Sequence, residues 1–300
     1  MNTWRIRIRP LSPWASPWRS DTIFGSLCWR WLELYPEDFE AVIDEFRAGG
    51  QPPFVVSDAW PWGLLPAPAH VPVQTGSAGN RKKLKPPLYL PEAAFRRIAA
   101  GQDRIANGVV SDVVRSLTRT QTAIDRDSGS AADGQLFETS CQHLAPGEDS
   151  LAVYVRTDRH IGRLAACFRA LALTGYGKKC SSGLGAFEVV GEPERCEWLD
   201  TVPNPNAFVA LNHFVPAPDD PADGVWRTHV SFPKFHSGSA HNLFKGTVLM
   251  LTPGSVFRTG DAPPRSWYGT IIPVPRPEMP KAFHYGLCCP APVVWNGRDA

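Results

Sequence analysis

The chain has 300 residues, a hydrophobic content of 43% and a formal net charge of only +2 at pH 7. This length suits one large domain or two domains of roughly 100 to 150 residues each. The N-terminus is charged, with arginine at positions 5, 7 and 9, and no later stretch approaches the roughly 20 apolar residues that a membrane span needs. We therefore expect no membrane insertion, no secretion and no non-specific coating of nucleic acid.

The seven cysteines are an odd number, and no two of them form a CxxC pair. Neither a disulfide framework nor a zinc knuckle is indicated, so we expect buried free thiols in a reducing cytoplasm. No cofactor is expected. A metal site built from His236, His241 and a cysteine has no recurring ligand spacing in its favour.

Positive charge is concentrated between residues 156 and 179. This segment contains only one acid, Asp158, and six cations: Arg156, Arg159, Arg163, Arg169, Lys178 and Lys179. Because the overall charge is low, any RNA site must use local charge of this kind.

The chain is expected to begin with a strand that runs directly into a helix. Residues 4–9 alternate apolar side chains with arginine, which is the pattern of a half-buried strand. Ser20 or Asp21 is expected to cap the following amphipathic helix. Residues 36–47 are expected to form a second helix, and residues 54–56 a short strand.

The middle of the chain holds a basic run and then a polar hairpin. The run at 81–85, which includes Lys82 and Lys83, is a candidate for RNA contact or simply a solvated loop. Residues 115–137 alternate polar and apolar side chains on either side of a turn rich in Asp, Ser and Gly, which predicts a long β-hairpin.

A strand at 151–155, a helix from Ile161 to Gly175 and a strand at 187–190 follow. With the first strand and helix, they predict an α+β fold of the ferredoxin type. We expect this domain to span 1–195 and a smaller, strand-rich domain to span 196–300.

The densest signal is TGYGKKCSSGLGAF at 174–187, which packs four glycines, two lysines and two serines into one turn. Glycine permits positive φ and close approach of a ligand, and exposed N–H groups with lysines suit a phosphate. A Walker A loop is excluded because it would need glycine in place of Ala172 and Ser or Thr in place of Lys179. A dinucleotide fingerprint would need glycine at Cys180 and a strand before the loop. A glycine-rich turn without a ligand is the alternative.

Three segments, in this order and spacing, resemble the repeat-associated mysterious proteins (RAMPs) of CRISPR systems. They are SPWRSDTIFGSLCW at 16–29, IDRDSGSAADGQLF at 124–137 and the glycine-rich loop at 175–185. They are most similar to the Csm-type subunit that holds the 5′ tag of the guide RNA in type III-A complexes. The resemblance covers residues 1 to about 190 and continues mainly through GTVLMLTPGSVF at 246–257.

The resemblance implies two ferredoxin-like (RRM-like) domains, with the glycine-rich loop and a thumb β-hairpin at about 115–140 protruding. It implies a non-catalytic subunit of a cytoplasmic antiviral ribonucleoprotein. Such a subunit caps the tag of the CRISPR guide RNA and bridges a large polymerase/cyclase-like subunit to the RAMP backbone subunit. The residues expected to contact RNA are Arg19, Ser20, Lys82, Lys83, Arg115, Arg119, Arg126, Gly175, Tyr176, Gly177, Lys178, Lys179, Ser181, Ser182, Gly183 and Gly185.

Two other functions are compatible with the sequence. Some RAMP relatives are endoribonucleases that use histidine as a general acid or base, but none of the eight histidines here is paired with an acid or a second histidine at a motif spacing. A protein-only interaction scaffold is suggested by the tryptophan-rich loops at 14–18 and 60–62. The hairpin, likewise, could pack on a neighbouring subunit rather than on RNA.

Overall fold

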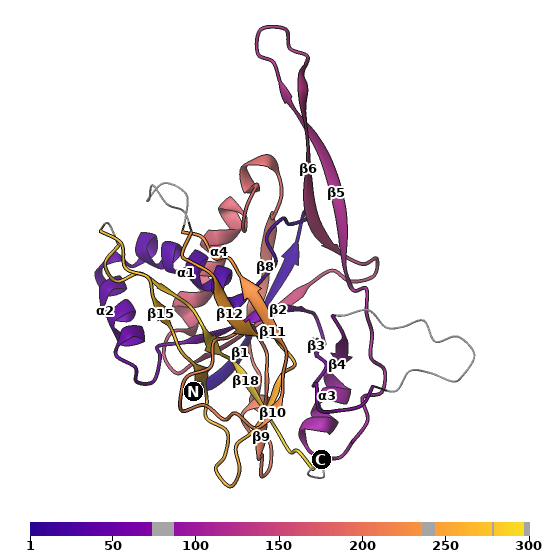
Figure 1. The fold of residues 1–300 in the computed structure, drawn as a ribbon, viewed down its shortest axis with the longest axis vertical. Helices are drawn as coiled ribbons and strands as arrows, with labels where there is room; N and C mark the ends of the chain where they lie inside the picture. The colour runs from indigo at the N-terminus through magenta and orange to yellow at the C-terminus, as the bar shows by residue number, and fades with distance from the viewer. Residues whose placement is uncertain (74–86, 236–243, 278, 297–300) are drawn as a thin grey trace, which may run out of the picture.

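The computed structural model describes residues 1–73, 87–235, 244–277 and 279–296 (Figure 1). The predicted RNA contacts Lys82 and Lys83 lie outside these described residues, as do the metal candidates His236 and His241. None of the described helices is long and apolar enough to cross a membrane. All seven cysteines are free.

The N-terminal half is built on a four-stranded antiparallel sheet with the strand order β2-β7-β1-β8. Its elements follow the chain as β1 (Asn2–Pro10), α1 (Ser20–Leu34), β2 (Val55–Pro61), β7 (Leu151–Thr157), α4 (Ile161–Thr174) and β8 (Phe187–Arg195). The predicted strand–helix–strand order of both halves of this unit is therefore present. Strand β1 lies between β7 and β8, so segments about 150 residues apart meet at the centre of the sheet.

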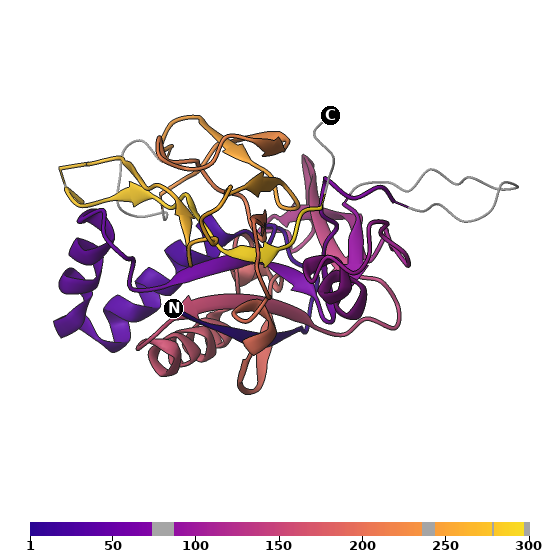
Figure 2. The same ribbon diagram turned by 90° about the horizontal axis from the view of Figure 1, so that it is seen from below.

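The alternation in β1 sorts its residues as the sequence predicts, because Ile6 and Ile8 are buried while the arginines between them are only partly covered. Every residue of β7 is buried. A strand is covered on both faces in this way only when a layer lies on each side of its sheet. Figure 2 shows these layers, with α4 on one side of the sheet and the C-terminal strands on the other.

Helix α1 begins one residue earlier than the predicted cap. Arg19 is the N-cap and makes no side-chain capping bond, while Ser20 and Asp21 already belong to the first turn. The prediction that Ser20 or Asp21 caps the helix is therefore wrong. Helix α2 (Pro36–Arg47) has the predicted bounds.

Helix α3 (Glu92–Ala99) is not among the predicted elements; it follows the short strand pair β3 (Leu64–Pro66) and β4 (Tyr89–Pro91). This helix has only eight residues, so its period covers little more than two turns and is weak as a sequence signal. It buries Phe95, Ile98 and Ala99.

The predicted hairpin is present and is longer than expected. Strands β5 (Val114–Ile124) and β6 (Ala131–Leu144) form a separate two-stranded sheet that projects from the body of the molecule (Figure 1). A turn at Asp125 closes it, with the backbone N–H groups of Asp127 and Ser128 donating to Oδ1 of Asp125.

The C-terminal half consists of strands, with no α-helix among its described residues after the short 3-10 helix η2 (Glu197–Leu199). A four-stranded sheet in the order β10-β13-β9-β18 is formed by β9 (Ala207–Ala210), β10 (Gly224–Val225), β13 (Val256–Arg258) and β18 (Pro290–Val293). Three two-stranded pairs complete it: β11 (Thr228–Ser231) with β12 (Val248–Leu251), β14 (Tyr268–Gly269) with β17 (Leu287–Cys288), and β15 (Ile272–Pro273) with β16 (Phe283–His284).

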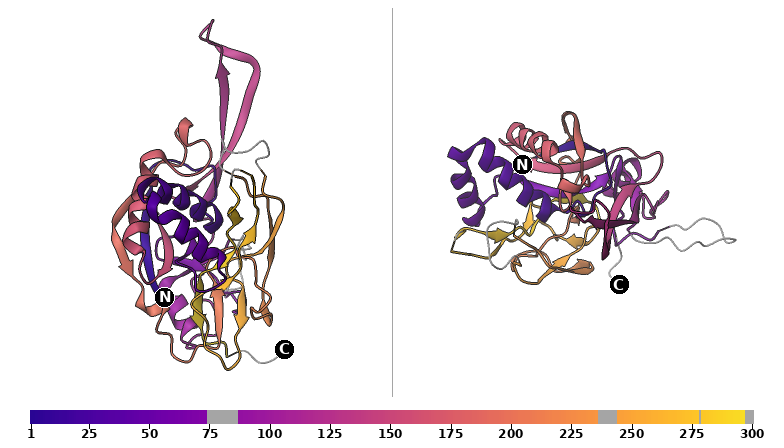
Figure 3. Two further views of the ribbon diagram at one scale, coloured as in Figure 1. Left: turned by 90° about the vertical axis from the view of Figure 1, so that its left-hand side faces the viewer. Right: turned by 90° about the horizontal axis from the view of Figure 1, so that it is seen from above.

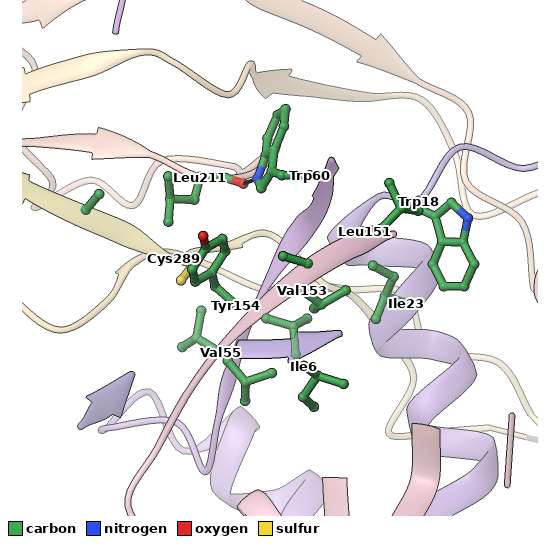
Figure 4. Packing of buried hydrophobic residues seen from close by; sticks show 14 of the residues in the cluster. Ile6, Trp18, Ile23, Val55, Trp60, Leu151, Val153, Tyr154, Leu211 and Cys289 are labelled. Atoms are coloured by element: carbon green, nitrogen blue, oxygen red, sulfur yellow. Dashed lines mark hydrogen bonds between the residues drawn. The ribbon is translucent and has the colours of Figure 1, made fainter. Parts of the chain in front are cut away.

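One hydrophobic cluster joins the two halves and runs from Ile6 to Val293. Figure 4 shows Trp60 and Tyr154 of the first sheet beside Leu211 and Cys289 of the C-terminal half. The indole N–H of Trp60 donates to the carbonyl of Leu211 at 2.9 Å across this junction. The C-terminal strands therefore supply the second cover of the N-terminal sheet.

Candidate RNA interface

The glycine-rich loop folds back on itself through residues with left-handed backbone angles. Gly175, Gly177, Gly183 and Gly185 have φ between +72° and +84°, and Lys179 has φ of +65°. Glycine adopts such angles without steric cost, whereas other residues do so rarely. The loop contains the 3-10 turn η1 (Cys180–Ser182).

Gly177 and Gly185 also allow close approach of other atoms. A Cβ atom on Gly185 would lie 2.1 Å from the carbonyl oxygen of Tyr176, and one on Gly177 would lie 2.4 Å from Cβ of Ser16. Gly183, by contrast, faces open space, with nothing within 4 Å of the same position. Gly185 is thus needed to close the loop, and Gly183 is free to face a ligand.

Tyr176 anchors the loop rather than offering a surface. Its side chain is fully buried, its ring stacks on Trp18 with centroids 3.8 Å apart, and its hydroxyl donates to the carbonyl of Pro17 at 2.9 Å. Burial raises the pKa of Tyr176 well above its usual value, with Asp21 and Asp58 adding to the effect. In this arrangement the ring of Tyr176 cannot stack on an RNA base.

The outer part of the loop carries the groups that suit a phosphate. Lys178, Lys179, Ser181 and Ser182 are exposed. Within the described part of the chain, no hydrogen-bond acceptor is found for the backbone N–H groups of Gly177, Lys179, Cys180 and Ser181. Open N–H groups beside two ammonium groups form a site for an oxyanion.

The segment before α1 ties the loop to the base of the hairpin. Gly185 N–H donates to the carbonyl of Pro13 at 2.7 Å, and Lys178 N–H donates to Oγ of Ser16 at 2.9 Å. Trp14 pairs with Gln142 of β6 through both backbone groups and through its indole N–H. The segment before α1 therefore connects the glycine-rich loop to the base of the hairpin.

The hairpin itself touches the loop. Nζ of Lys179 lies 5.0 Å from the centre of the Phe137 ring on β6, which is a cation–π distance. Arg115, Arg119 and Arg126 are all exposed on the hairpin, and Ile124 is 61% exposed near its tip. The loop lysines therefore meet the hairpin at Phe137, and the hairpin carries three exposed arginines along its length.

Most of the positive charge predicted between 156 and 179 is already neutralised. Arg159 pairs with Glu45, Arg163 with Asp38 and Arg169 with Glu192, while Arg156 is buried and donates to backbone carbonyls. In the sequence those acids lie in separate clusters, and the fold brings them onto α4 and its neighbours. Of this segment, the loop lysines alone remain as cations outside ion pairs within the described residues.

Arg19 and Ser20 lie in a polar cluster between α1 and the C-terminal strands. Ser20 is buried, its N–H donates to Oδ1 of Asp58 at 2.7 Å, and its hydroxyl bonds the carbonyl of His213. Arg19 donates to Nε2 of His229 at 2.7 Å. The half-buried Arg19 can still face RNA, whereas Ser20 has no exposed surface.

Asp58 and two histidines are the site residues that sequence reasoning missed. Nδ1 of His213 lies 2.6 Å from Oδ2 of Asp58, and the His213 and His229 rings are 5.2 Å apart. Burial and Arg19 lower the pKa of His229, which suits its role as acceptor from that arginine. His213 and Asp58 are 155 positions apart, so no motif spacing could have paired them. Among the described residues, no group of three His, Cys, Asp or Glu side chains could hold a metal ion.

No family model matches the sequence, and no curated protein matches it either. Solved structures, however, share its fold over almost the whole chain. A chain of the Csm1-Csm4 cassette in complex with cA4 superposes with a TM-score of 0.60 at 16% identity, covering 98% of this chain and 100% of that one. A chain of the Csm3-Csm4 subcomplex of the type III-A CRISPR-Cas interference complex gives 0.58 at 15% identity with the same coverage.

The chain has the fold of a type III CRISPR complex subunit. A chain of the type III-B Cmr-beta complex, bound to cognate target RNA and AMPPnP, is more distant, with a TM-score of 0.50 at 12% identity over 85% of this chain and 86% of that one. The resemblance drawn from the sequence is confirmed at the level of the fold.

Proposed function

We propose that this protein is a non-catalytic, RNA-binding subunit of a type III CRISPR effector complex that holds the 5′ tag of the guide RNA. The fold supports membership of such a complex. The RNA role is supported above all by the contact between Lys179 and Phe137, which joins the glycine-rich loop to the hairpin. The loop contributes open backbone N–H groups and two lysines, and the hairpin contributes three exposed arginines.

The loop would hold a phosphate of the tag. Backbone N–H groups donate to phosphate oxygens without reading sequence, which suits a tag whose sequence is constant. The open position of Gly183 leaves room for the sugar–phosphate chain to approach. The hairpin arginines would then follow the RNA as it leaves the loop.

Two ferredoxin-like domains remain part of this proposal. The N-terminal unit has the required order of strands and helices and the interleaved sheet order. The C-terminal sheet would be a second such unit in which strands and loops replace the helices among the described residues. The expected boundary near residue 195 falls at the end of β8.

The partners follow from the same proposal. The structural neighbours come from structures named for Csm1 with Csm4 and for Csm3 with Csm4. We expect a large polymerase/cyclase-like subunit and a RAMP backbone subunit to bind this chain in the cytoplasm.

The loop lysines provide the direct test. Changing Lys178 and Lys179 to glutamate should lower RNA retention of the assembled complex by about tenfold or more, because anions then stand where two cations neutralised phosphates. The slope of binding against salt should also fall by about one unit for each lysine replaced. The ratio of absorbance at 260 and 280 nm of the purified complex, followed over a salt series, measures both changes.

Arg169→Glu is the matched control because that arginine already pairs with Glu192. The control complex should keep its RNA, since its altered side chain lies outside the proposed phosphate site. An equal decrease of RNA retention in both variants would contradict the proposal.

RNA cleavage is a second candidate because of the Asp58–His213 pair. A carboxylate on Nδ1 holds the ring so that Nε2 can accept a proton, and His229 lies beside it. We favour the non-catalytic role because these groups bind one another. Arg19 is held by His229, and the side chain of His213 is only 15% exposed.

A further inference from the structure

An apolar surface lies on the outer side of the strand pair β11–β12, opposite the inner side on which His229 binds Arg19. Val230 and Leu249 face each other across the pair and are 47% and 59% exposed. Phe232, just after β11, is 64% exposed, and Trp226, just before it, is 50% exposed. We call these four residues the β11–β12 face.

The inner side of the same strands is already filled by other side chains, so the side chains of the β11–β12 face remain on the outer surface. Val248 and Met250 of β12 and Ser231 of β11 are buried, and His229 binds Arg19 beneath the sheet. Figures 2 and 3 show the C-terminal strands as the outer layer of the molecule, on the side opposite α4. Clustered apolar groups at such a position are typical of an interaction surface.

The chain segment that carries the face contains cations and no acids. No aspartate or glutamate occurs between Asp223 and Asp261, whereas Arg227 and Lys234 flank the face and are exposed. An occupant must therefore offer apolar side chains at its centre and negative charge at its rim.

A protein fits this face better than single-stranded RNA. RNA platforms stack successive bases on aromatic rings, and stacked bases lie about 3.4 Å apart. Trp226 and Phe232 are separated by six residues of extended chain, or roughly 20 Å. The side chains between them, Val230 and Leu249, are aliphatic and offer no ring to a base.

We propose that the β11–β12 face docks the large subunit of the same type III complex, through apolar side chains of that subunit surrounded by acidic ones. This rests on the proposed function. Chains of this fold occur beside Csm1 in the cassette structures. The hairpin and glycine-rich loop lie at a different side of the molecule (Figure 3). They remain free to bind RNA and the backbone subunits that assemble along the RNA.

The test is binding of the full-length chain to the large subunit of its own complex, measured by calorimetry. Val230→Glu with Leu249→Glu should weaken binding at least about tenfold, because both central apolar side chains are replaced and negative charge is added to face an acidic rim. Leu173→Glu is the control, since Leu173 is 88% exposed on α4, at the opposite side. Val230→Ala with Leu249→Ala should weaken binding less, and circular dichroism should show all variants folded.

Three results would overturn the proposal. The first is unchanged affinity for the large subunit in the double glutamate variant. The second is self-association of the parent chain that the variant abolishes, which would make the occupant a second copy. The third is loss of RNA or of the backbone subunit while binding to the large subunit is kept. If instead the proposed function were wrong, the complex would keep its RNA after Lys178 and Lys179 are changed to glutamate.

Discussion

Tyr176 and Gly185 close the glycine-rich loop, whereas Gly183 lies where a ligand would approach. The N–H of Tyr176 donates to the carbonyl of Gly185 at 2.8 Å, and no side chain fits at Gly185 beside the Tyr176 carbonyl. The loop glycine and serine positions expected to bind RNA therefore do not play equal parts. Some shape the loop, and others can face the tag.

Valine at the two glycines should separate these roles. Gly185→Val should cost about 3 kcal/mol or more of unfolding free energy, since it adds a backbone overlap to a positive φ. Gly183→Val should cost only about 1 kcal/mol, since the space there is open, yet it should weaken RNA binding. Thermal unfolding and RNA retention, measured on both variants, check this. If both assembled with RNA as tightly as the parent, the loop would not be the site.

Buried His284 and half-buried His70 make stability depend on pH. Burial lowers the pKa of His70 to about 4, helped by Arg258, and lowers that of His284 to about 4. In the unfolded chain a histidine takes up its proton near pH 6.5. The unfolded state therefore binds more protons as pH falls from about 6.5 to 4, and the free energy of unfolding should fall over this window, by roughly 3 kcal/mol at most for each residue.

Denaturant unfolding at several pH values measures this effect. His70→Gln, which cannot take up a proton, should flatten the slope between pH 6.5 and 4, whatever it does to stability at pH 7. Replacing His143, which lies on β6 of the hairpin, serves as a comparison. An unchanged slope in the His70 variant would show that this residue titrates normally in the folded chain.

At the scale of elements, the hairpin is the most exposed part of the structure. Its strands pair with each other and have no third strand, and its residues beyond the base are largely exposed. Such a hairpin buries little apolar surface, so on its own it is only marginally stable and opens readily. A binding partner would stabilise it. RNA along its arginines, or a neighbouring subunit, would supply that partner.

Charge reversal distinguishes the two partners of the hairpin. Arg119→Glu with Arg126→Glu should weaken RNA retention most strongly at low salt and should make binding less dependent on salt, because phosphate contacts depend on charge whereas packing depends mainly on shape. The isolated subunit should stay folded, since both side chains are exposed and neither is in an ion pair among the described residues. Unchanged RNA content of the variant complex across a salt series would leave the hairpin as a protein–protein element.

The elements in which apolar residues recur with a clear period could be predicted from the sequence. Features that depend on segments distant in the chain could not. The alternation in β1, the helical spacing in α2 and α4 and the polar hairpin indicated the correct element types, because local periodicity reflects which face is buried. Short α3 was missed. The sequence shows the cations in and just before α4, but it cannot show that Asp38, Glu45 and Glu192 fold onto them.

The same limit applied to the site. The glycine-rich loop could be located because glycine and lysine are locally dense there, but the burial of Tyr176 depends on Trp18, which lies far away in the chain. The Asp58–His213 pair depends on the C-terminal half folding over the first sheet. Both are products of tertiary structure.

At the scale of the whole molecule, we predict that the purified subunit cleaves no RNA, with or without divalent metal. The groups that could act as acid and base are engaged with each other beneath the C-terminal strands. Incubation with labelled repeat RNA is the measurement. Specific cuts that disappear in His213→Ala but persist in His143→Ala would establish the endoribonuclease instead.

The position of β1 at the centre of its sheet also has a consequence for synthesis. Its partners β7 and β8 come later in the chain, with paired residues from 143 (Ile8 and Leu151) to 191 (Trp4 and Arg195) positions apart. A ribosome adds about 5 to 20 residues per second, so the nascent β1 remains without its two neighbours for on the order of 10 to 40 s. During that time its backbone edges are open to pairing with other chains, and Arg5, Arg7 and Arg9 place a charge at every second residue, which opposes aggregation until β8 emerges.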